Sequence, residues 1–446
     1  MITMTIRTAK RAIPLLATVV LLSACKDGSD NKTDAHQADE FDISSTGRLV
    51  VTAAESSELA ILNSTDGSLI ERFSLDNPAS GLYASPQSRF ALVAQRDQNQ
   101  VQVLDGGLYQ EDHGDHLHPY EKNPSMLAQT LDGVRPTHHR NNESRSAFFF
   151  DGEGDQGLMA SIADFDDDEI LNNNVRSLEL SNAMHGVAEP RGDFLISTYR
   201  APDASHAVLP DQVELYKFNS NSGGYEFVER FEELCPLLHG GFSTEDASIF
   251  GCSDGVLVVH QDGDQFSTTK IDNPAGMAEG ARIGGFSGFS DSNLVAGWAR
   301  GELYAVTLDP DNHENDKMEF VDWRDGTDIG AEAEYSTAKM DDEGEILMVL
   351  NKSGGLHLLD AQDNFKHLIE IKVLSALPEF EGHGHVSITS SKSGEDVYIT
   401  DAINNQIVVV NLEHQEIEEP ISLPFTPKHV AWVGIAGEGH DHEHEH

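Results

Sequence analysis

Short apolar runs alternate with polar turns along most of the chain, and they recur in pairs. In each pair, an apolar run is followed by a turn rich in Gly, Asn or Asp and then by a second apolar run. This pattern is typical of antiparallel strands joined by tight turns. Eight pairs can be counted, and their first runs are residues 47–52, 88–94, 146–151, 192–197, 247–252, 293–297, 344–350 and 396–400.

The spacing of these pairs predicts the fold. They recur roughly every 45 to 50 residues with no long amphipathic helix between them, which is typical of the blades of a β-propeller. We therefore expect an all-β protein with a single eight-bladed propeller around a central channel, seven blades being the alternative. Residues 41–45 would complete the last blade and close the ring.

The first 24 residues have the pattern of a bacterial lipoprotein signal peptide. Basic residues precede an apolar run at 12–22 that is too short to span a bilayer, and residues 22–25 read as a lipobox. We expect cleavage before Cys25 and a lipid on its thiol. Lys26 favours anchoring to the periplasmic face of the outer membrane. An ordinary secretory signal with soluble release is the alternative.

Four segments follow from these patterns. Residues 26–40 lack large apolar side chains, which is typical of a disordered segment, and the last residues are rich in His and acids. We expect a signal peptide at 1–24, a lipidated flexible tether at 25–40, the propeller at 41–435 and a flexible tail at 436–446.

Export to the periplasm bears on the other two cysteines. Cys235 and Cys252 are an even pair in an oxidising compartment, and the simplest expectation is a disulfide between them. A pair of thiolate metal ligands is the alternative, which the compartment and the spacing disfavour. We therefore assign metal chemistry to histidines and carboxylates.

The charge of the chain excludes two classes of partner. Its 29 Lys and Arg against 76 Asp and Glu give a formal net charge of −47. Such a field repels nucleic acids and anionic lipid headgroups, so we expect no nucleic acid partner and no membrane contact beyond the lipid anchor. We expect a monomer.

Histidines gather in one loop between the second and third pairs of apolar runs. His113, Asp115, His116 and His118 lie within six residues, together with Gly114 and close to Pro119, which disfavour a helix or central strand. Imidazole is the commonest protein ligand of zinc, and a flexible loop can place several around one ion. A solvated polar loop is the alternative.

Further histidines lie just before the apolar runs of several blades. If the blades repeat, these positions converge on the central channel, where propellers bind ligands. The candidates for metal binding there are His138, His185, His239 and His385, with His429 as a weaker case. The alternative is that each forms hydrogen bonds with the neighbouring blade.

The C-terminal tail alternates imidazole with carboxylate. This composition has no apolar partner for packing and is typical of a disordered segment that chelates loosely. An expression tag is the competing explanation. The tail histidines are His440, His442, His444 and His446.

Several motifs together resemble one known family, the periplasmic zinc metallochaperones of Azt-type zinc ABC transporters (the AztD family). The segments that carry the resemblance are 112–118, 135–138, 149–154, 185–188, 235–240 and 251–256. The family implies a propeller that binds zinc and passes it to the solute-binding protein of the transporter. By this analogy, the loop with His113, His116 and His118 is mobile, and channel histidines complete a buried site.

We therefore interpret the chain as a periplasmic zinc chaperone and not an enzyme. A metal-dependent propeller hydrolase or lactonase is a second hypothesis, for which Asp151, Glu153 and Asp155 could supply carboxylates, although no ordered nucleophile or base motif is present. A third hypothesis is an envelope scaffold with incidental metal binding.

Overall fold

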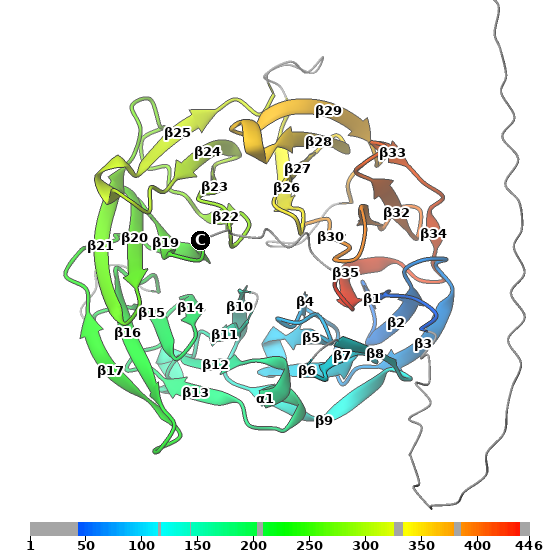
Figure 1. Ribbon diagram of the computed structural model, residues 1–446, viewed down its shortest axis with the longest axis horizontal. Helices are drawn as coiled ribbons and strands as arrows, with labels where there is room; N and C mark the ends of the chain where they lie inside the picture. The colour runs from blue at the N-terminus through cyan, green and yellow to red at the C-terminus, as the bar shows by residue number, and fades with distance from the viewer. Residues whose placement is uncertain are drawn as a thin grey trace, which may run out of the picture. The chain divides into compact units, whose positions relative to one another are not determined.

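Each pair of apolar runs forms the two central strands of one propeller blade. The computed structural model describes residues 43–114, 117–142, 144–202, 208–324, 333–378 and 385–437. In these residues the chain forms eight antiparallel sheets that surround one axis as the blades of a single β-propeller (Figure 1). The predicted all-β, eight-bladed fold is confirmed. The expected tether at 25–40 lies outside the described residues.

The first four blades come from the N-terminal half of the described chain and from its last strand. Their strands, from the axis outward, are β35 (Pro427–Gly434), β1 (Gly47–Ala53), β2 (Glu58–Asn63) and β3 (Leu69–Ser74); β4 (Gly81–Ala84), β5 (Phe90–Gln95), β6 (Gln100–Asp105) and β9 (Ser125–Asp132); β10 (Pro136–Asn141), β11 (Ser146–Phe150), β12 (Ser161–Phe165) and β13 (Arg176–Glu179); and β14 (Ala188–Arg191), β15 (Phe194–Tyr199), β16 (Gln212–Asn219) and β17 (Gly224–Arg230).

The other four blades follow in chain order. They consist of β18 (His239–Ser243), β19 (Ala247–Cys252), β20 (Gly255–Asp262) and β21 (Gln265–Asp272); β22 (Gly285–Ser287), β23 (Leu294–Ala299), β24 (Glu302–Thr307) and β25 (Lys317–Val321); β26 (Tyr335–Met340), β27 (Ile346–Asn351), β28 (Gly355–Asp360) and β29 (Lys366–Lys372); and β30 (Ile388–Ser390), β31 (Asp396–Asp401), β32 (Gln406–Asn411) and β33 (Glu416–Ile417), with β34 (Ile421–Ser422) also paired to β32.

Short helical turns and one hairpin complete the described elements. The helical turns are α1 (Asp167–Leu171), η1 (Arg96–Gln98), η2 (Gly154–Gln156), η3 (His313–Asn315) and η5 (Ala361–Asp363). The hairpin consists of β7 (Leu108–Asp112) and β8 (Leu117–Glu121) and is inserted between β6 and β9. In the described part of the chain, none of the helices is both long and apolar enough to span a lipid bilayer.

The apolar core lies between neighbouring blades. The central strands are buried on both faces, as in β1, where all seven residues are buried. Side chains of adjacent blades therefore pack together, for example Leu350 of β27 with Val397 of β31. Leu49 of β1 packs in the same way with Tyr398 of β31, which joins the eighth blade to the first.

The C-terminal strand closes the ring, which corrects the expectation for residues 41–45. β35 is the innermost strand of the first blade and pairs with β1, with Val50 opposite Ala431. Of the residues expected to complete the last blade, 43–45 lie before β1 outside any strand, and 41 and 42 are outside the described residues. The pairing arises because Val430–Val433 is a buried apolar run that supplies β1 with a partner strand.

The two faces of the propeller carry different connections. Because the strands of a blade alternate in direction, the end of each outer strand and the start of the next inner strand lie on one face. We call this the crossover face; it carries residues 133–135, 180–187 and 231–238. The turns from the third to the fourth strand of a blade lie on the opposite face, which we call the hairpin face because it carries β7 and β8.

Candidate metal centre

Three histidines from three successive blades meet on the crossover face. His138 lies in β10, His185 lies just before β14, and His239 is the first residue of β18. One ligand atom from each residue lies within 4.8 Å of the others. The Nε2 atoms of His185 and His239 are 3.2 Å apart. We call these three residues the histidine triad.

Irregular pairing in two inner strands accompanies this arrangement. The register of β10 on β11 shifts between Pro136 and His138, and that of β18 on β19 shifts between His239 and Gly241. A bulge of this kind turns a side chain away from the direction that regular pairing would give it. Gly240 has a φ of +73°, a conformation that glycine adopts without strain. The local sequence thus allows His239 to leave the regular strand geometry.

Hydrogen bonds at Nδ1 orient all three rings. His138 donates to the carbonyl of Gly186 at 2.7 Å, and His239 donates to the carbonyl of Gly284 at 2.8 Å. A carbonyl only accepts, so Nδ1 carries the proton in both rings. His185 Nδ1 lies 3.1 Å from Asp151 Oδ2 and donates to it. Each neutral ring therefore keeps a lone pair on Nε2, the atom that remains free to bind a metal.

Asp151 links the triad to a neighbouring blade. It follows β11 directly, is 6% exposed, and accepts a second bond from Arg96 Nη2 at 2.9 Å. The backbone N–H of Met184 donates to the Asp151 carbonyl at 2.9 Å, which places the next residue, His185, beside the carboxylate. Burial raises the pKa of Asp151, but the hydrogen bonds from His185 and Arg96 more than offset this and lower it overall. The carboxylate is therefore ionised at neutral pH.

Burial keeps two of the three imidazoles neutral. Burial, with the nearby charges of Arg140 and His185, lowers the pKa of His138 to about 3. Burial also lowers the pKa of His239 to about 4. The Nε2 atoms of His185 and His239, 3.2 Å apart, are close enough to bind one cation together.

The separation of His185 and His239 fits two nitrogen ligands of one tetrahedral ion. Zinc binds imidazole at about 2.0 to 2.1 Å, so two ligands of a tetrahedral zinc lie about 3.3 to 3.4 Å apart. The separation of 3.2 Å between His185 and His239 is close to this value. Among the described residues, the group contains three ligands. Three protein ligands leave one position of a tetrahedral ion open to water or to a ligand from another molecule.

His113 and His118, the described histidines of the 111–119 loop, do not join the triad. His113 and His118 belong to the β7–β8 hairpin segment, where their rings lie 4.6 Å apart. This segment lies on the hairpin face, whereas the triad lies on the crossover face. The fold therefore does not bring His113 and His118 into one site with the triad. His116 and Asp115 lie outside the described residues.

The remaining predicted positions fall elsewhere. His385 precedes β30 and is exposed, and its Nδ1 atom lies 3.0 Å from the Val386 carbonyl oxygen. His429 lies in β35, where burial lowers its pKa to about 3. Neither belongs to the triad. Cys25 and the tail histidines His440, His442, His444 and His446 are outside the described residues.

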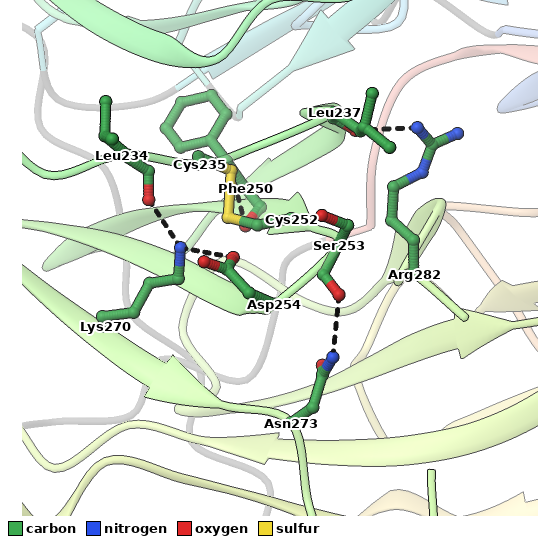
Figure 2. Close-up of a disulfide and its surroundings, with 10 residues drawn as sticks. All are labelled: Leu234, Cys235, Leu237, Phe250, Cys252, Ser253, Asp254, Lys270, Asn273 and Arg282. Atoms are coloured by element: carbon green, nitrogen blue, oxygen red, sulfur yellow. Dashed lines mark hydrogen bonds and ion pairs between the residues drawn. A yellow bond between two sulfur atoms is a disulfide. The ribbon is translucent and has the colours of Figure 1, made fainter. Parts of the chain in front are cut away.

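The predicted disulfide is present next to the triad. Cys235 and Cys252 are bonded, and neither is exposed to solvent. Cys235 lies on the crossover connection that leads to His239, and Cys252 ends β19 (Figure 2).

Sequence reasoning did not assign Asp151 and Arg96 to the metal centre. The sequence suggests Asp151 only as a carboxylate for a hydrolase and does not single out Arg96. One signal was available for Asp151, because it directly follows an apolar run whose blade also contains His138. For Arg96 the sequence offers no signal, since its contact with Asp151 joins two blades.

Comparisons with known proteins agree with the fold. No protein-family model matches the chain. The zinc chaperone AztD of Citrobacter koseri is 22% identical over 414 residues, which cover 90% of each chain. Two solved structures of AztD from Citrobacter koseri, one of them apo, superpose with TM-scores of 0.72 and 0.71 at 19% and 18% identity. Both cover 88% of this chain and 99% of the solved chain.

A third solved structure shares the fold at a greater distance. The dihydro-heme d1 dehydrogenase NirN has a TM-score of 0.56 and 12% identity, covering 88% of this chain and 76% of its own. At this identity the likeness concerns the fold alone. The sequence and structure comparisons together confirm the resemblance of this chain to the AztD family of zinc chaperones.

Proposed function

We propose that this protein is a periplasmic zinc chaperone that binds one zinc ion at His138, His185 and His239. It passes the ion to the zinc-binding solute protein of an ABC transporter. In this proposal zinc is the cargo of the protein, which acts as a monomer and not as an enzyme. A lipid on Cys25 holds it at the periplasmic face of the outer membrane.

One observation carries the proposal. Three imidazoles place one ring nitrogen each within 4.8 Å of the others, while Nδ1 of each lies against a hydrogen-bond acceptor. Zinc-binding histidines are oriented in this way, commonly with one carboxylate among the acceptors. Burial also keeps two of the rings unprotonated, so at neutral pH zinc does not have to displace protons from them.

The relative from Citrobacter koseri supports zinc as the metal and a chaperone as the role. The protein from Citrobacter koseri that matches along 90% of this chain is named a zinc chaperone. Three imidazole ligands suit zinc, although they also bind copper and nickel. Competition with these metals measures the selectivity directly.

An open fourth position explains how the ion can leave. A closed cage of four protein ligands exchanges zinc slowly, whereas a ligand from a second protein can enter a site with three. The triad is partly buried on the crossover face, so we propose that the receiving protein approaches there. Its first ligand would bind the ion before the triad releases it.

The other histidines would collect zinc at low affinity. His113, His116 and His118, with Asp115, would form one loose site. The tail with His440, His442, His444 and His446 would form another. His385 would contribute only to weak binding, because it is exposed and is not part of the triad.

A metal-dependent hydrolase is a second candidate, favoured by the same open position. Three histidines with one free coordination site are also typical of catalytic zinc, which activates a bound water. Turnover of ester or lactone substrates by the zinc-loaded protein would support it. Absence of turnover, together with transfer of zinc to an apo zinc-binding solute protein, would support the chaperone.

The decisive experiment compares three proteins for zinc content after purification from the periplasm without an added tag. They are the mature chain from residue 26, a version that ends at residue 437, and the variant His138→Ala/His185→Ala/His239→Ala. We expect about one tightly bound zinc in the first two and none in the variant. Zinc lost with the tail, or retained by the variant, would contradict the proposal.

A further inference from the structure

The connection that leads to His239 is held in place by several hydrogen bonds and by the disulfide. It runs from β17 to β18 on the crossover face and includes Leu234 to Leu238. Leu237 has a φ of +54°, a left-handed conformation that a leucine adopts only when its surroundings hold it there. The residue that provides a triad nitrogen therefore follows directly after a constrained backbone.

Hydrogen bonds from one neighbouring strand and two loops fix this connection. Lys270 Nζ donates to the Leu234 carbonyl at 2.6 Å, and Arg282 Nη1 donates to the Leu237 carbonyl at 2.7 Å (Figure 2). The N–H of Ser253 donates to the Pro236 carbonyl at 2.8 Å. Two of its own N–H groups, at residues 235 and 238, donate to the carbonyls of residues 211 and 210.

The disulfide adds a covalent bond to the hydrogen bonds that hold this connection. It joins Cys235 to Cys252, with 4.8 Å between the Cα atoms, and both residues are fully buried. Cys252 is adjacent to Gly251, whose Cα is paired with that of His239 in the sheet. The bond thus ties the start of the connection to the strand end against which His239 lies.

Space around this pairing is tight. A Cβ placed on Gly251 would lie 2.1 Å from the Ile283 carbonyl oxygen and 2.9 Å from that of His239. The connection after β21 therefore lies close against Gly251. It also ends at Gly284, whose carbonyl accepts the Nδ1 proton of His239. Backbone and ring of His239 are thus positioned by the same few residues.

We propose that the Cys235–Cys252 disulfide is a positioning element of the zinc site, acting through His239. This inference rests on the proposed function, because it assigns the disulfide to the same triad. Without the bond, the left-handed turn at Leu237 can relax, and His239 Nε2 loses its fixed place 3.2 Å from His185 Nε2. Since both sulfur atoms are buried, the role is one of geometry and not of redox control.

The test is the zinc affinity of Cys235→Ala/Cys252→Ala, measured by competition with a chromogenic chelator. We expect the dissociation constant to rise at least tenfold, with a changed visible spectrum of the cobalt-loaded protein, because a displaced His239 alters the coordination geometry. The matched control is Leu358→Ala in the core of another blade, where the side chain is fully buried. It lowers stability without contact to the triad and should leave affinity and spectrum unchanged.

Three outcomes would overturn the inference. They are an unchanged affinity in the double variant, an equal loss in Leu358→Ala, and a cobalt spectrum identical to that of the native protein. If the double variant does not fold, Lys270→Met, which frees the Leu234 carbonyl, is measured instead. A threefold weaker affinity is then expected, and no change refutes the proposal. Absence of zinc binding in the native protein would instead contradict the proposed function itself.

Discussion

The clearest prediction concerns Asp151, the carboxylate that orients His185. In Asp151→Asn, the side chain keeps its size but loses its charge. Its oxygen could still accept from His185, but only if the amide nitrogen faced away from that ring. The native carboxylate accepts from both His185 and Arg96 through the same oxygen, Oδ2. The substitution therefore weakens a charge-assisted bond that fixes the ring and increases its basicity.

The size of the effect can be estimated in two ways that agree. Loss of a group that orients a metal ligand typically weakens metal binding about 10- to 100-fold, or about 1.4 to 2.7 kcal/mol. A hydrogen bond to a charged group contributes about 1.5 to 3 kcal/mol. We therefore expect the zinc dissociation constant of Asp151→Asn to rise by one to two orders of magnitude.

The assay is competition with a chelator of known affinity at pH 7.5, on protein shown to be folded by circular dichroism. Asp155→Asn is the control, since this exposed carboxylate lies in the same connection between β11 and β12 and its substitution changes the net charge equally. Its affinity should stay within twofold of the native value. Native affinity in Asp151→Asn, or an equal loss in both variants, would refute the orienting role.

Three further predictions follow from the same geometry. His113→Ala/His118→Ala should leave the tight zinc site unchanged within twofold in chelator competition, because the hairpin lies on the other face; a large loss would place the loop in that site. Zinc at 100 times its dissociation constant should raise the free energy of unfolding by about 2.7 kcal/mol in urea titrations, and excess chelator should reverse this, unless zinc also binds the unfolded chain. Burial, partly offset by Arg140 and by Ser243, raises the pKa of Glu189 to about 7 from an ordinary 4.5. Between pH 4.5 and about pH 7, the folded state therefore binds more protons than the unfolded chain. Ionisation of the buried carboxylate costs the folded state roughly 3 kcal/mol at most. This cost is present above pH 7 and is relieved as pH falls. Glu189→Gln should accordingly reduce the difference in stability between pH 8 and pH 5, and an unchanged difference would contradict the buried, ionised state.

The sequence by itself determined the fold class and the number of blades. The two central strands of each blade are buried on both faces, so they appear as paired apolar runs whose period counts the blades directly. It also singled out the three histidines of the triad, because each lies just before an apolar run of its blade. The disulfide followed from an even pair of cysteines in an exported chain.

Only the tertiary structure decided which histidines share a site. His185 and His239 are 54 residues apart in the chain and 3.2 Å apart in space, since the ring of blades brings equivalent positions together. Whether a loop lies on the crossover face or on the hairpin face depends on the number of strands between that loop and the next blade. The strand between the hairpin and His138 is β9, whose side chains are mostly half-exposed, so it forms no apolar run that the sequence pattern could count. The pairing of β35 with β1 and the contact of Asp151 with His185 also became visible only once the blades were placed side by side.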